Sequence, residues 1–280
     1  MLSFLIILLG FWPLLRLIGT HNPTDTTEGI KVLTYNIGKT RVDFSRSDKK
    51  IHINGFKKFI KNEAPDIVCL QERIKAHNNI YSDIFNQYNV TPNPELGTAV
   101  YSKYPILEVG NMPFESKAHN ATWADIVIKK DTLRFYSIHL SSNRITKVTG
   151  EMMENPDISN KELWNDIKFI FREYHYHAKL RSKQLDQILK HSLTSPYPVV
   201  LSGDFNDVSQ SYIYRKVCSH YKDAFRECGF GLNKTFISFM PGLRIDYTFV
   251  DMQIPLLDQY TVKTRLSDHY PVITRIDHLN

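Results

Sequence analysis

Cysteine is scarce in this chain of 280 residues, which contains only Cys69, Cys218 and Cys228. Three cysteines do not provide the disulfide framework that stabilises small secreted domains. Cys69 lies in an apolar run, which indicates a small buried hydrophobic residue. Cys218 and Cys228 would pair only if the domain folds in an oxidising compartment.

Repeats and low-complexity segments are absent as well. With 42% hydrophobic and 23% charged residues, the composition is that of a globular protein with either one large domain or two small ones. The net charge of +6 favours an anionic partner, such as a phosphate ester, a nucleic acid or an acidic lipid headgroup, without choosing between them. We interpret two basic clusters as solvated helix faces. They are formed by Lys57, Lys58 and Lys61 and by Lys179, Arg181, Lys183 and Lys190.

Charge is missing altogether from Met1 to Leu15, and the apolar character continues past Arg16. The run is shorter than the roughly 20 apolar residues of a membrane-spanning helix, yet long for a soluble helix. Because it lacks the basic start and the cleavage site of a secretory signal, we expect a membrane anchor over residues 1–19 and a linker over residues 20–29. A buried core helix and the tail of a longer membrane segment are the alternatives. The flanking charges do not decide which side of the membrane the domain faces.

Short apolar runs that end in polar residues recur through the rest of the chain. Residues 30–36 predict a first strand that ends at Asn36, and residues 66–71 predict a buried strand followed by Glu72. A helix is predicted over residues 50–63, where apolar residues share one face. Further strands are predicted over residues 98–107, 123–129, 133–140, 199–201, 235–239 and 243–251, and after Pro271.

More polar side chains that suit catalysis lie at or near strand ends. The strand over residues 199–201 is followed by Gly203 and then by Asp204 and Asn206. On an extended segment the side chains of Asp204 and Asn206 would point the same way. His139 approaches the edge of the sheet, and Asp246 lies in an apolar strand where it needs a partner. Asp268 and His269 directly precede the last strand. Taken singly, each has an ordinary explanation as a turn former or a surface residue.

Together, these polar residues at strand ends are a more specific signal of a catalytic site than any one of them. With Asn36 and Glu72 it comprises four carboxylates, two amides and two imidazoles. Such an oxygen-rich set suits Mg²⁺ or Mn²⁺ better than structural zinc. Fixed cations and hydrogen-bond donors are also what phosphoester hydrolysis needs, because charge develops on the phosphoryl oxygens in the transition state.

Six short motifs occur in the order Tyr-Asn-Ile-Gly, Leu-Gln-Glu, Ile-His-Leu, Gly-Asp-Phe-Asn, Arg-Ile-Asp-Tyr and Ser-Asp-His-Tyr-Pro. In this order, over residues 30–274, the chain resembles the endonuclease/exonuclease/phosphatase superfamily. The resemblance implies an α/β (α+β) fold, a four-layered sandwich of two mixed β-sheets flanked by helices, in a domain over residues 30–280. It also implies a phosphohydrolase that depends on Mg²⁺ (or Mn²⁺).

The resemblance further implies which residues bind metal and water. Glu72 is expected to be the principal metal ligand, with Asn36 beside it and Asp268 binding or tuning a metal. Asp204 is expected to orient or deprotonate the attacking water, and Asn206 to position it.

The resemblance implies that Asn206 also contacts the phosphate, together with two histidines. His269 is expected to donate to the phosphoryl oxygens, while Asp246 accepts a hydrogen bond from the other ring nitrogen and fixes the tautomer. His139 is expected to hold the opposite side of the phosphate. Hydrolysis would then proceed by in-line attack of water, without a covalent enzyme intermediate.

The choice between the substrate branches of the superfamily depends on fewer residues. Abasic-site DNA endonucleases carry an acid two residues after the first asparagine, where this chain has Gly38. They also carry a tryptophan shortly before the final Ser-Asp-His, where this chain has Thr264 to Leu266. The histidine at position 139 is a point of similarity to the deoxyribonuclease, sphingomyelinase and inositol-phosphatase branches, which use a histidine there. We therefore expect a membrane-associated phosphoesterase that acts on lipid or small-molecule phosphoesters. A nuclease acting on DNA or RNA is the alternative, and a non-catalytic phosphate-binding module is a third; no obligate protein partner is indicated.

Residues 141–178 are expected to separate these branches, because loops of this length are often lids or binding elements. A basic, aromatic groove there would favour nucleic acid. Exposed apolar side chains would favour a lipid interface; the candidates are Trp164, Phe169 and Phe171. His175 and His177 would lie on different faces of the helix that ends at Leu193, so we interpret both as surface residues.

Overall fold

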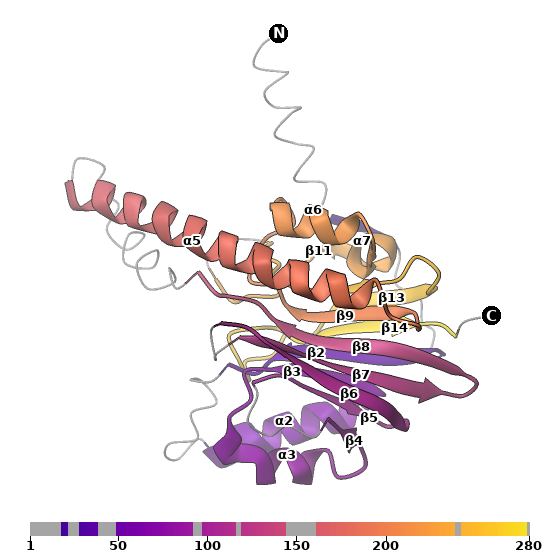
Figure 1. Cartoon of the computed structure of the whole chain (residues 1–280). Coiled ribbons are helices and arrows are strands. Elements are labelled where there is room, and N and C mark those ends of the chain that lie inside the picture. The colour runs from indigo at the N-terminus through magenta and orange to yellow at the C-terminus, as the bar shows by residue number, and fades with distance from the viewer. Residues whose placement is uncertain are drawn as a thin grey trace.

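The computed structural model describes residues 18–21, 28–38, 49–91, 97–115, 119–143, 161–238 and 242–278. Its described strands form two six-stranded sheets and a separate two-stranded sheet. The two large sheets are stacked, and helices cover both outer faces (Figure 1). The four-layered α/β sandwich predicted from the sequence is confirmed.

The first large sheet has the strand order β10-β12-β9-β8-β7-β6. Its members are β6 (Ile106–Pro113), β7 (Asn120–Ile128), β8 (Asp131–His139), β9 (Val199–Asp204), β10 (Lys222–Asp223) and β12 (Asp246–Val250). Only β8 and β9 run parallel, and the long α5 (Lys161–Ser192) connects the chain between them. The sheet is therefore mixed, as predicted.

The second large sheet has the order β13-β14-β2-β3-β5-β4. Its members are β2 (Ile30–Asn36), β3 (Ile67–Gln71), β4 (Asn89–Val90), β5 (Ala99–Ser102), β13 (Leu256–Thr261) and β14 (Val272–Ile276). Here β2 and β3 form the parallel pair, joined through α2 (Lys49–Glu63). The shorter elements η2 (Lys75–His77) and α3 (Asn78–Ile84) follow β3.

Alternation along the strands supplies apolar side chains to both faces of each sheet. Phe135 of β8 and Val200 of β9 pack between the sheets against Val32 and Ile67 of the second sheet. The neighbouring Tyr136 faces outward, towards the helices. Both faces of the central strands are therefore buried, which explains their almost continuous apolar sequences.

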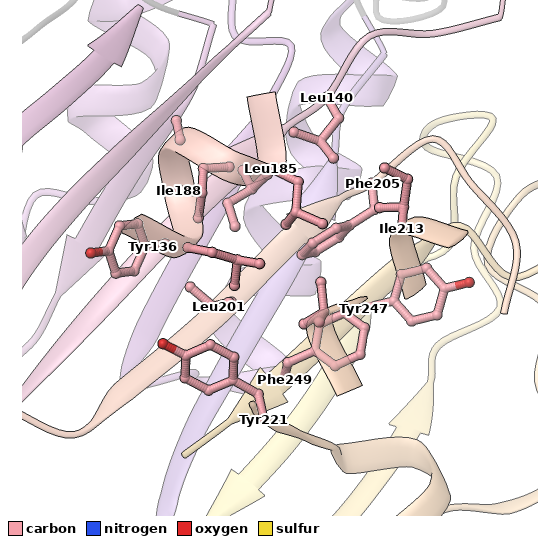
Figure 2. Packing of buried hydrophobic residues seen from close by; sticks show 14 of the residues in the cluster. Tyr136, Leu140, Leu185, Ile188, Leu201, Phe205, Ile213, Tyr221, Tyr247 and Phe249 are labelled. Carbon is pink, nitrogen blue, oxygen red and sulfur yellow. The ribbon is translucent and has the colours of Figure 1, made fainter. Parts of the chain in front are cut away.

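The outer face of the first sheet is covered by the second half of α5 and by α6 (Tyr212–Cys218). Leu185 and Ile188 of α5 lie over Tyr136 and Leu201, beside a group of aromatic rings that includes Phe249 (Figure 2). The outer face of the second sheet is covered in the same way by α2 and α3. This packing fixes the strand ends that carry the polar residues.

Two sequence-based strand assignments differ from the structure. Residues 98–107 contribute to two strands in different sheets, β5 and β6, separated by a turn in which Ser102 Oγ accepts a hydrogen bond from Tyr104 N. Within residues 235–239, as far as they are described, only Phe236 forms a bridge, to His269. Thr235 instead uses its hydroxyl to accept hydrogen bonds from the amides of residues 245 and 246.

Residues 1–17 lie outside the described part of the chain, and so does most of the predicted membrane anchor. The end of that segment, β1 (Ile18–Thr20), pairs antiparallel with β11 (Phe230–Leu232), next to α7 (Ala224–Cys228). Within the described ranges, no helix is long and apolar enough to cross a membrane. Cys218 and Cys228 are free, as is the buried Cys69.

Candidate active site

The polar residues meet at one edge of the sandwich because of the strand directions. Asn36 ends β2, and Glu72 directly follows its parallel neighbour β3. In the other sheet His139 ends β8, and Asp204 ends the parallel β9. Parallel neighbours end at the same edge, and the stacking of the two sheets brings the two pairs of ends together.

Antiparallel neighbours add the remaining residues to the same edge. Asp246 begins β12 and is the cross-strand partner of Asp204. His269 lies just before β14, which runs antiparallel to β2, so the chain enters β14 where β2 ends. Residues that are up to 233 positions apart in the sequence thus surround one point.

Asp204 is at the centre of the cluster and is held by three hydrogen bonds. Its Oδ1 accepts from the amide of Asn206 at 2.8 Å, and its Oδ2 accepts from Asn36 Nδ2 at 2.9 Å and from Asn206 Nδ2 at 3.2 Å. Burial, and next the charge of Asp246, raise the pKa of Asp204 to about 7, although His269 and these hydrogen bonds lower it. A carboxyl with such a pKa is suited to proton transfer near neutral pH.

Asn206 reaches Asp204 in a different way from the extended geometry expected. Its φ is 52°, in the left-handed region that asparagine tolerates better than most residues. The chain therefore turns back, and Asn206 Nδ2 also donates to the carbonyl of Leu140 at 2.9 Å. The carboxylate and the amide still lie side by side, but a turn, not strand alternation, places them there.

His269 and Asp246 form a buried pair. His269 Nδ1 lies 2.9 Å and 3.1 Å from the two carboxylate oxygens of Asp246, and its Nε2 lies 3.8 Å from Asp204 Oδ2. Burial lowers the pKa of His269, but the carboxylates of Asp246 and Asp204 outweigh it and raise the pKa to about 10. The ring is therefore protonated at neutral pH, with Nδ1–H donated to Asp246 and Nε2–H directed towards Asp204.

Glu72 and His139 form the other side of the cluster. His139 Nε2 lies 3.5 Å from Glu72 Oε1 and 3.8 Å from Asp204 Oδ2. Glu72 has a φ of 57°, an unusual value for glutamate and one that costs conformational energy. That conformation turns the side chain towards Asn36, whose Nδ2 lies 3.4 Å from Glu72 Oε1.

Asn36 and Asp268 are held by a short network next to these groups. Asn36 Oδ1 accepts from the amide of Gly38 at 3.0 Å, so its nitrogen, not its oxygen, faces the carboxylates. Ser267 Oγ donates to the carbonyl of Asn36 at 2.8 Å and lies 3.2 Å from Asp268 Oδ1. A Cβ on Gly38, which has a φ of +57°, would lie 2.9 Å from that Asp268 oxygen. The close approach of Asp268 thus requires glycine.

The donor set is suited to a divalent cation. Asp204, Asp246 and His269 offer ligand atoms within 4.8 Å of one another. Asp246 and His269 already bind each other, whereas the carboxylate of Glu72 is partly exposed at the same edge. Four carboxylates share the edge with two histidines, and a hard cation with oxygen ligands would balance this excess of negative charge.

One residue near the cluster, His119, is not among the site residues predicted from the sequence. His119 directly precedes β7, and its ring centroid lies 4.8 Å from that of His139. The signal that could have located it is the hairpin register, which places Asn120 opposite His139.

Two sequence-based surface assignments on α5 are wrong. His177 is only 6% exposed, because its Nδ1 lies 2.8 Å from Ser141 Oγ, whereas His175 is exposed as predicted. Arg181, read as part of a solvated face, is fully buried and binds Asp207 at 3.1 Å. Both side chains lie against the chain that leaves β8 and β9.

The first half of α5 carries exposed aromatic residues. It extends beyond the strands (Figure 1), and its Trp164 and Phe171 are 53% and 71% exposed. Phe169 is half-buried. Two of the three residues that would favour a lipid interface are therefore exposed.

The architecture, with two stacked mixed sheets and a cluster of acids and histidines at one edge, is that of a phosphoester hydrolase. The chain belongs to the endonuclease/exonuclease/phosphatase family, whose model matches residues 33–269. Members of this family are metal-dependent hydrolases of phosphoester bonds. The resemblance read from the six motifs is confirmed.

Solved structures with the same fold have low sequence identity to this chain. TDP2 from D. rerio, complexed with a single-strand DNA product, is 14% identical with a TM-score of 0.66 over 90% of this chain and 100% of that one. A mannosyl-6-phosphatase from Bacteroides thetaiotaomicron is 18% identical, with a TM-score of 0.60 over 89% and 100%. An endonuclease/exonuclease/phosphatase from Bacteroides vulgatus is 19% identical, with a TM-score of 0.63 over 91% and 100%. No curated protein matches the chain.

Proposed function

We propose that this chain is a divalent-metal-dependent phosphoesterase that hydrolyses lipid or small-molecule phosphoesters by in-line attack of water. The observation that carries the proposal is the cluster itself: the carboxylates of Glu72, Asp204 and Asp246 are connected to His139 and His269 by contacts of 2.9–3.8 Å. Such an arrangement can accept a proton from water on one side and donate hydrogen bonds to a phosphate on the other.

Asp204 is the residue best placed to receive the proton of the attacking water. Its carboxylate is fixed by Asn36 and Asn206, and its raised pKa suits a general base. Asn206 lies beside it and would position the water through its amide.

His269 and His139 would contact the phosphoryl oxygens from two sides. Their Nε2 atoms both lie 3.8 Å from Asp204 Oδ2, one from each sheet of the sandwich. Asp246 accepts Nδ1–H of the protonated His269 ring, which leaves Nε2–H as the donor available to the substrate. A protonated donor of this kind stabilises the charge that grows on the phosphoryl oxygens.

Glu72 would hold the cation, with Asp268 and Asn36 beside it. A bound Mg²⁺ or Mn²⁺ would neutralise part of the phosphate charge and polarise the phosphoryl group. Asn36, in the orientation described, would contribute mainly by holding Glu72 and Asp204 in place through its amide nitrogen.

Membrane association through residues 1–19 is the proposed localisation, with either side of the membrane open. It is supported by the uncharged sequence from Met1 to Leu15 and by the exposed Trp164 and Phe171 of α5. Because β1 begins at Ile18, a truncation that tests the anchor should remove residues 1–17 only. We expect the full chain to float with phosphatidylcholine–phosphatidylserine vesicles and the truncated chain to stay in solution; equal flotation of both would refute the anchor.

Nucleic acid is the second candidate substrate, because TDP2 shares the fold and was crystallised with a DNA product. Exposed Lys168, Arg172 and Lys179 on α5 would suit a phosphate backbone. This alternative predicts cleavage that weakens steeply as salt rises.

A hydrolysis panel tests the proposal. The full chain is assayed with Mg²⁺, Mn²⁺ or chelator against p-nitrophenyl phosphate, bis-p-nitrophenyl phosphate, sphingomyelin, inositol phosphates and single-stranded DNA. We expect metal-dependent cleavage that Glu72→Gln abolishes and that the matched control Glu108→Gln, on the exposed side of β6, preserves. Silence of the folded protein across the panel would contradict the proposal and favour a binding module.

A further inference from the structure

A pocket of about 380 Å³ opens beside the catalytic cluster, between the end of β8 and the middle of α5. It is lined by His119, Ser141, Arg172, Glu173, Tyr176, His177 and Leu180. Its link to the cluster is direct, because the ring of His119 packs against the ring of His139. A phosphate held by His139 would therefore direct one of its ester groups towards this pocket.

The floor of the pocket is rigid. Every polar group of Ser141 is engaged: its amide donates to Gln184 Oε1 at 2.9 Å, its carbonyl accepts from Arg181 Nη1 at 2.9 Å, and its hydroxyl lies 2.8 Å from His177 Nδ1. Arg181 is fixed in turn by Asp207, the residue that follows the Gly-Asp-Phe-Asn motif. The pocket is thus built from the same strand ends as the catalytic cluster.

The charge of the lining argues against a second phosphate as the occupant. Arg172 supplies one positive charge, and the neighbouring Glu173 supplies one negative charge. The Glu173 carboxylate lies 3.7 Å from His177 Nε2 and would repel another anion. A neutral group that both accepts and donates hydrogen bonds fits this balance better.

The shape and polarity argue against two other occupants. An acyl chain needs an apolar lining, but Leu180 is the single aliphatic residue in the pocket wall described here. A nucleobase needs a flat aromatic platform, whereas Tyr176 is 57% exposed at the rim and meets the His177 ring edge-on, at 82°. The volume also lies at the lower end of the range of about 300–1,000 Å³ for ligand pockets.

We infer that the pocket binds a polyhydroxylated ring, a sugar or a cyclitol, that is esterified to the phosphate held in the catalytic cluster. Glu173 accepts hydrogen bonds from ring hydroxyls, and the neighbouring Arg172 of the same lining donates to ring oxygens. Tyr176 and Leu180 cover an apolar face of the ring. The inference rests on the proposed phosphoesterase function and adds the substrate class; the ring belongs either to a soluble sugar or cyclitol phosphate or to a lipid headgroup.

The test compares substrates on the full chain with Mg²⁺ or Mn²⁺. The polyol substrates are hexose 6-phosphates, inositol 1-phosphate and phosphatidylinositol 4-phosphate in phosphatidylcholine vesicles, with phosphate release as the readout. The reference substrates are p-nitrophenyl phosphate and bis-p-nitrophenyl phosphate. The quantity of interest is kcat/KM for the best polyol substrate divided by kcat/KM for the best reference substrate.

We expect Glu173→Gln and Tyr176→Ala each to lower this ratio about tenfold, the effect of losing one charged or well-packed contact, and to do so through KM. The matched control Lys190→Ala, on the exposed face of the same helix and outside the pocket lining, should leave the ratio within about twofold. Faster turnover of the vesicle substrate would identify a lipid headgroup, and faster turnover of the soluble esters a free polyol phosphate. A melting temperature for each variant close to that of the parent excludes a folding defect as the cause.

The two hypotheses fail in different ways. No metal-dependent hydrolysis of any ester would overturn the proposed function and this inference together. Metal-dependent hydrolysis of the nitrophenyl esters with no hydrolysis of polyol phosphates, or a ratio unchanged in both pocket variants, would overturn the inference alone. Single-stranded DNA as the best substrate would overturn it as well.

Discussion

Arg244 and Asp223 are as deeply buried as Asp204 and Asp246, but the two regions balance their charges differently. Arg244 holds Asp223 through two parallel hydrogen bonds of 2.9 Å and 2.7 Å under β12, so one positive charge meets one negative charge. Arg134 and Asp125 repeat this arrangement between β8 and β7, with two hydrogen bonds of 2.6 Å. Paired in this way, buried charges are satisfied by the fold alone.

The catalytic edge lacks this balance. Four carboxylates lie there with two histidines, and His269 is protonated only because Asp246 and Asp204 raise its pKa. In place of an arginine, the cluster has a second acid: burial and the charge of Asp246 raise the pKa of Asp204 to about 7. Unbalanced buried charge, and not buried charge as such, therefore distinguishes the edge at which we propose that a cation and a substrate phosphate bind.

The largest effect is expected from removing the charge of Glu72. We expect Glu72→Gln to lower metal-dependent turnover roughly thousandfold or more, because the cation loses its main ligand while neighbouring groups keep their shape. The variant should unfold at a temperature close to that of the parent in chelator, since the side chain is partly exposed and glutamine keeps its shape. Turnover within tenfold of the parent would remove Glu72 from the site.

Removing the donor His269 should have a somewhat smaller effect. We expect His269→Ala to lower kcat roughly 10²- to 10³-fold, the usual cost of one donor to a developing negative charge. Asp246→Asn should reproduce part of this loss, because Asp246 orients the ring and its charge keeps the ring protonated. A loss below tenfold in His269→Ala would contradict its role.

The polar residues of the proposed site, which the structure brings together at one edge, could be selected from the sequence because each follows or begins an apolar run. Glu72 after β3 and Asp204 at the end of β9 are positions where a strand pattern stops, and the strand pattern itself was clear. The motifs then linked distant strand ends to one family. The fold class could be predicted for the same reason, since the strands supply their own periodicity.

Features that depend on contacts between distant segments could not be predicted. Arg181 on α5 resembles a surface arginine until the turn after β9 brings Asp207 against it. His177 is buried by Ser141, 36 positions earlier. Likewise, the extended geometry expected for Asn206 is replaced by a left-handed turn, in which its side chain donates to the carbonyl of the distant Leu140. The pocket beside His119 is formed by these contacts, so it could not be predicted from the sequence either.

The balanced region should respond to mutation in the opposite way, through stability. We expect Arg244→Met to lower the free energy of unfolding by about 3–5 kcal/mol, because Asp223 would be left buried without its cation. The matched control is Lys57→Met, which removes an exposed ion pair with Asp83 and should cost at most about 1 kcal/mol. Chemical denaturation measures both. A loss below 1 kcal/mol for Arg244→Met would show that the fold relaxes enough to hydrate Asp223.

The smallest effect expected is a pH dependence of stability in chelator that belongs to the catalytic edge alone. The pKa of His269 is raised from 6.5 to about 10 in the folded protein, so its contribution to stability is complete below pH 6.5 and is lost as the pH rises through 10. The raised pKa of Asp204 acts in the same direction at lower pH, between 3.8 and about 7. Between pH 7 and pH 8, below the range in which the cysteines of the unfolded chain ionise, stability should therefore fall by at most about 1.4 kcal/mol for one proton. His269→Ala should remove this slope. Arg244→Met removes a guanidinium that stays charged throughout this pH range, so it should retain the slope at a lower stability. An equal slope in His269→Ala and the parent would show that the alkaline dependence comes from other groups and that the charge of His269 is not linked to folding.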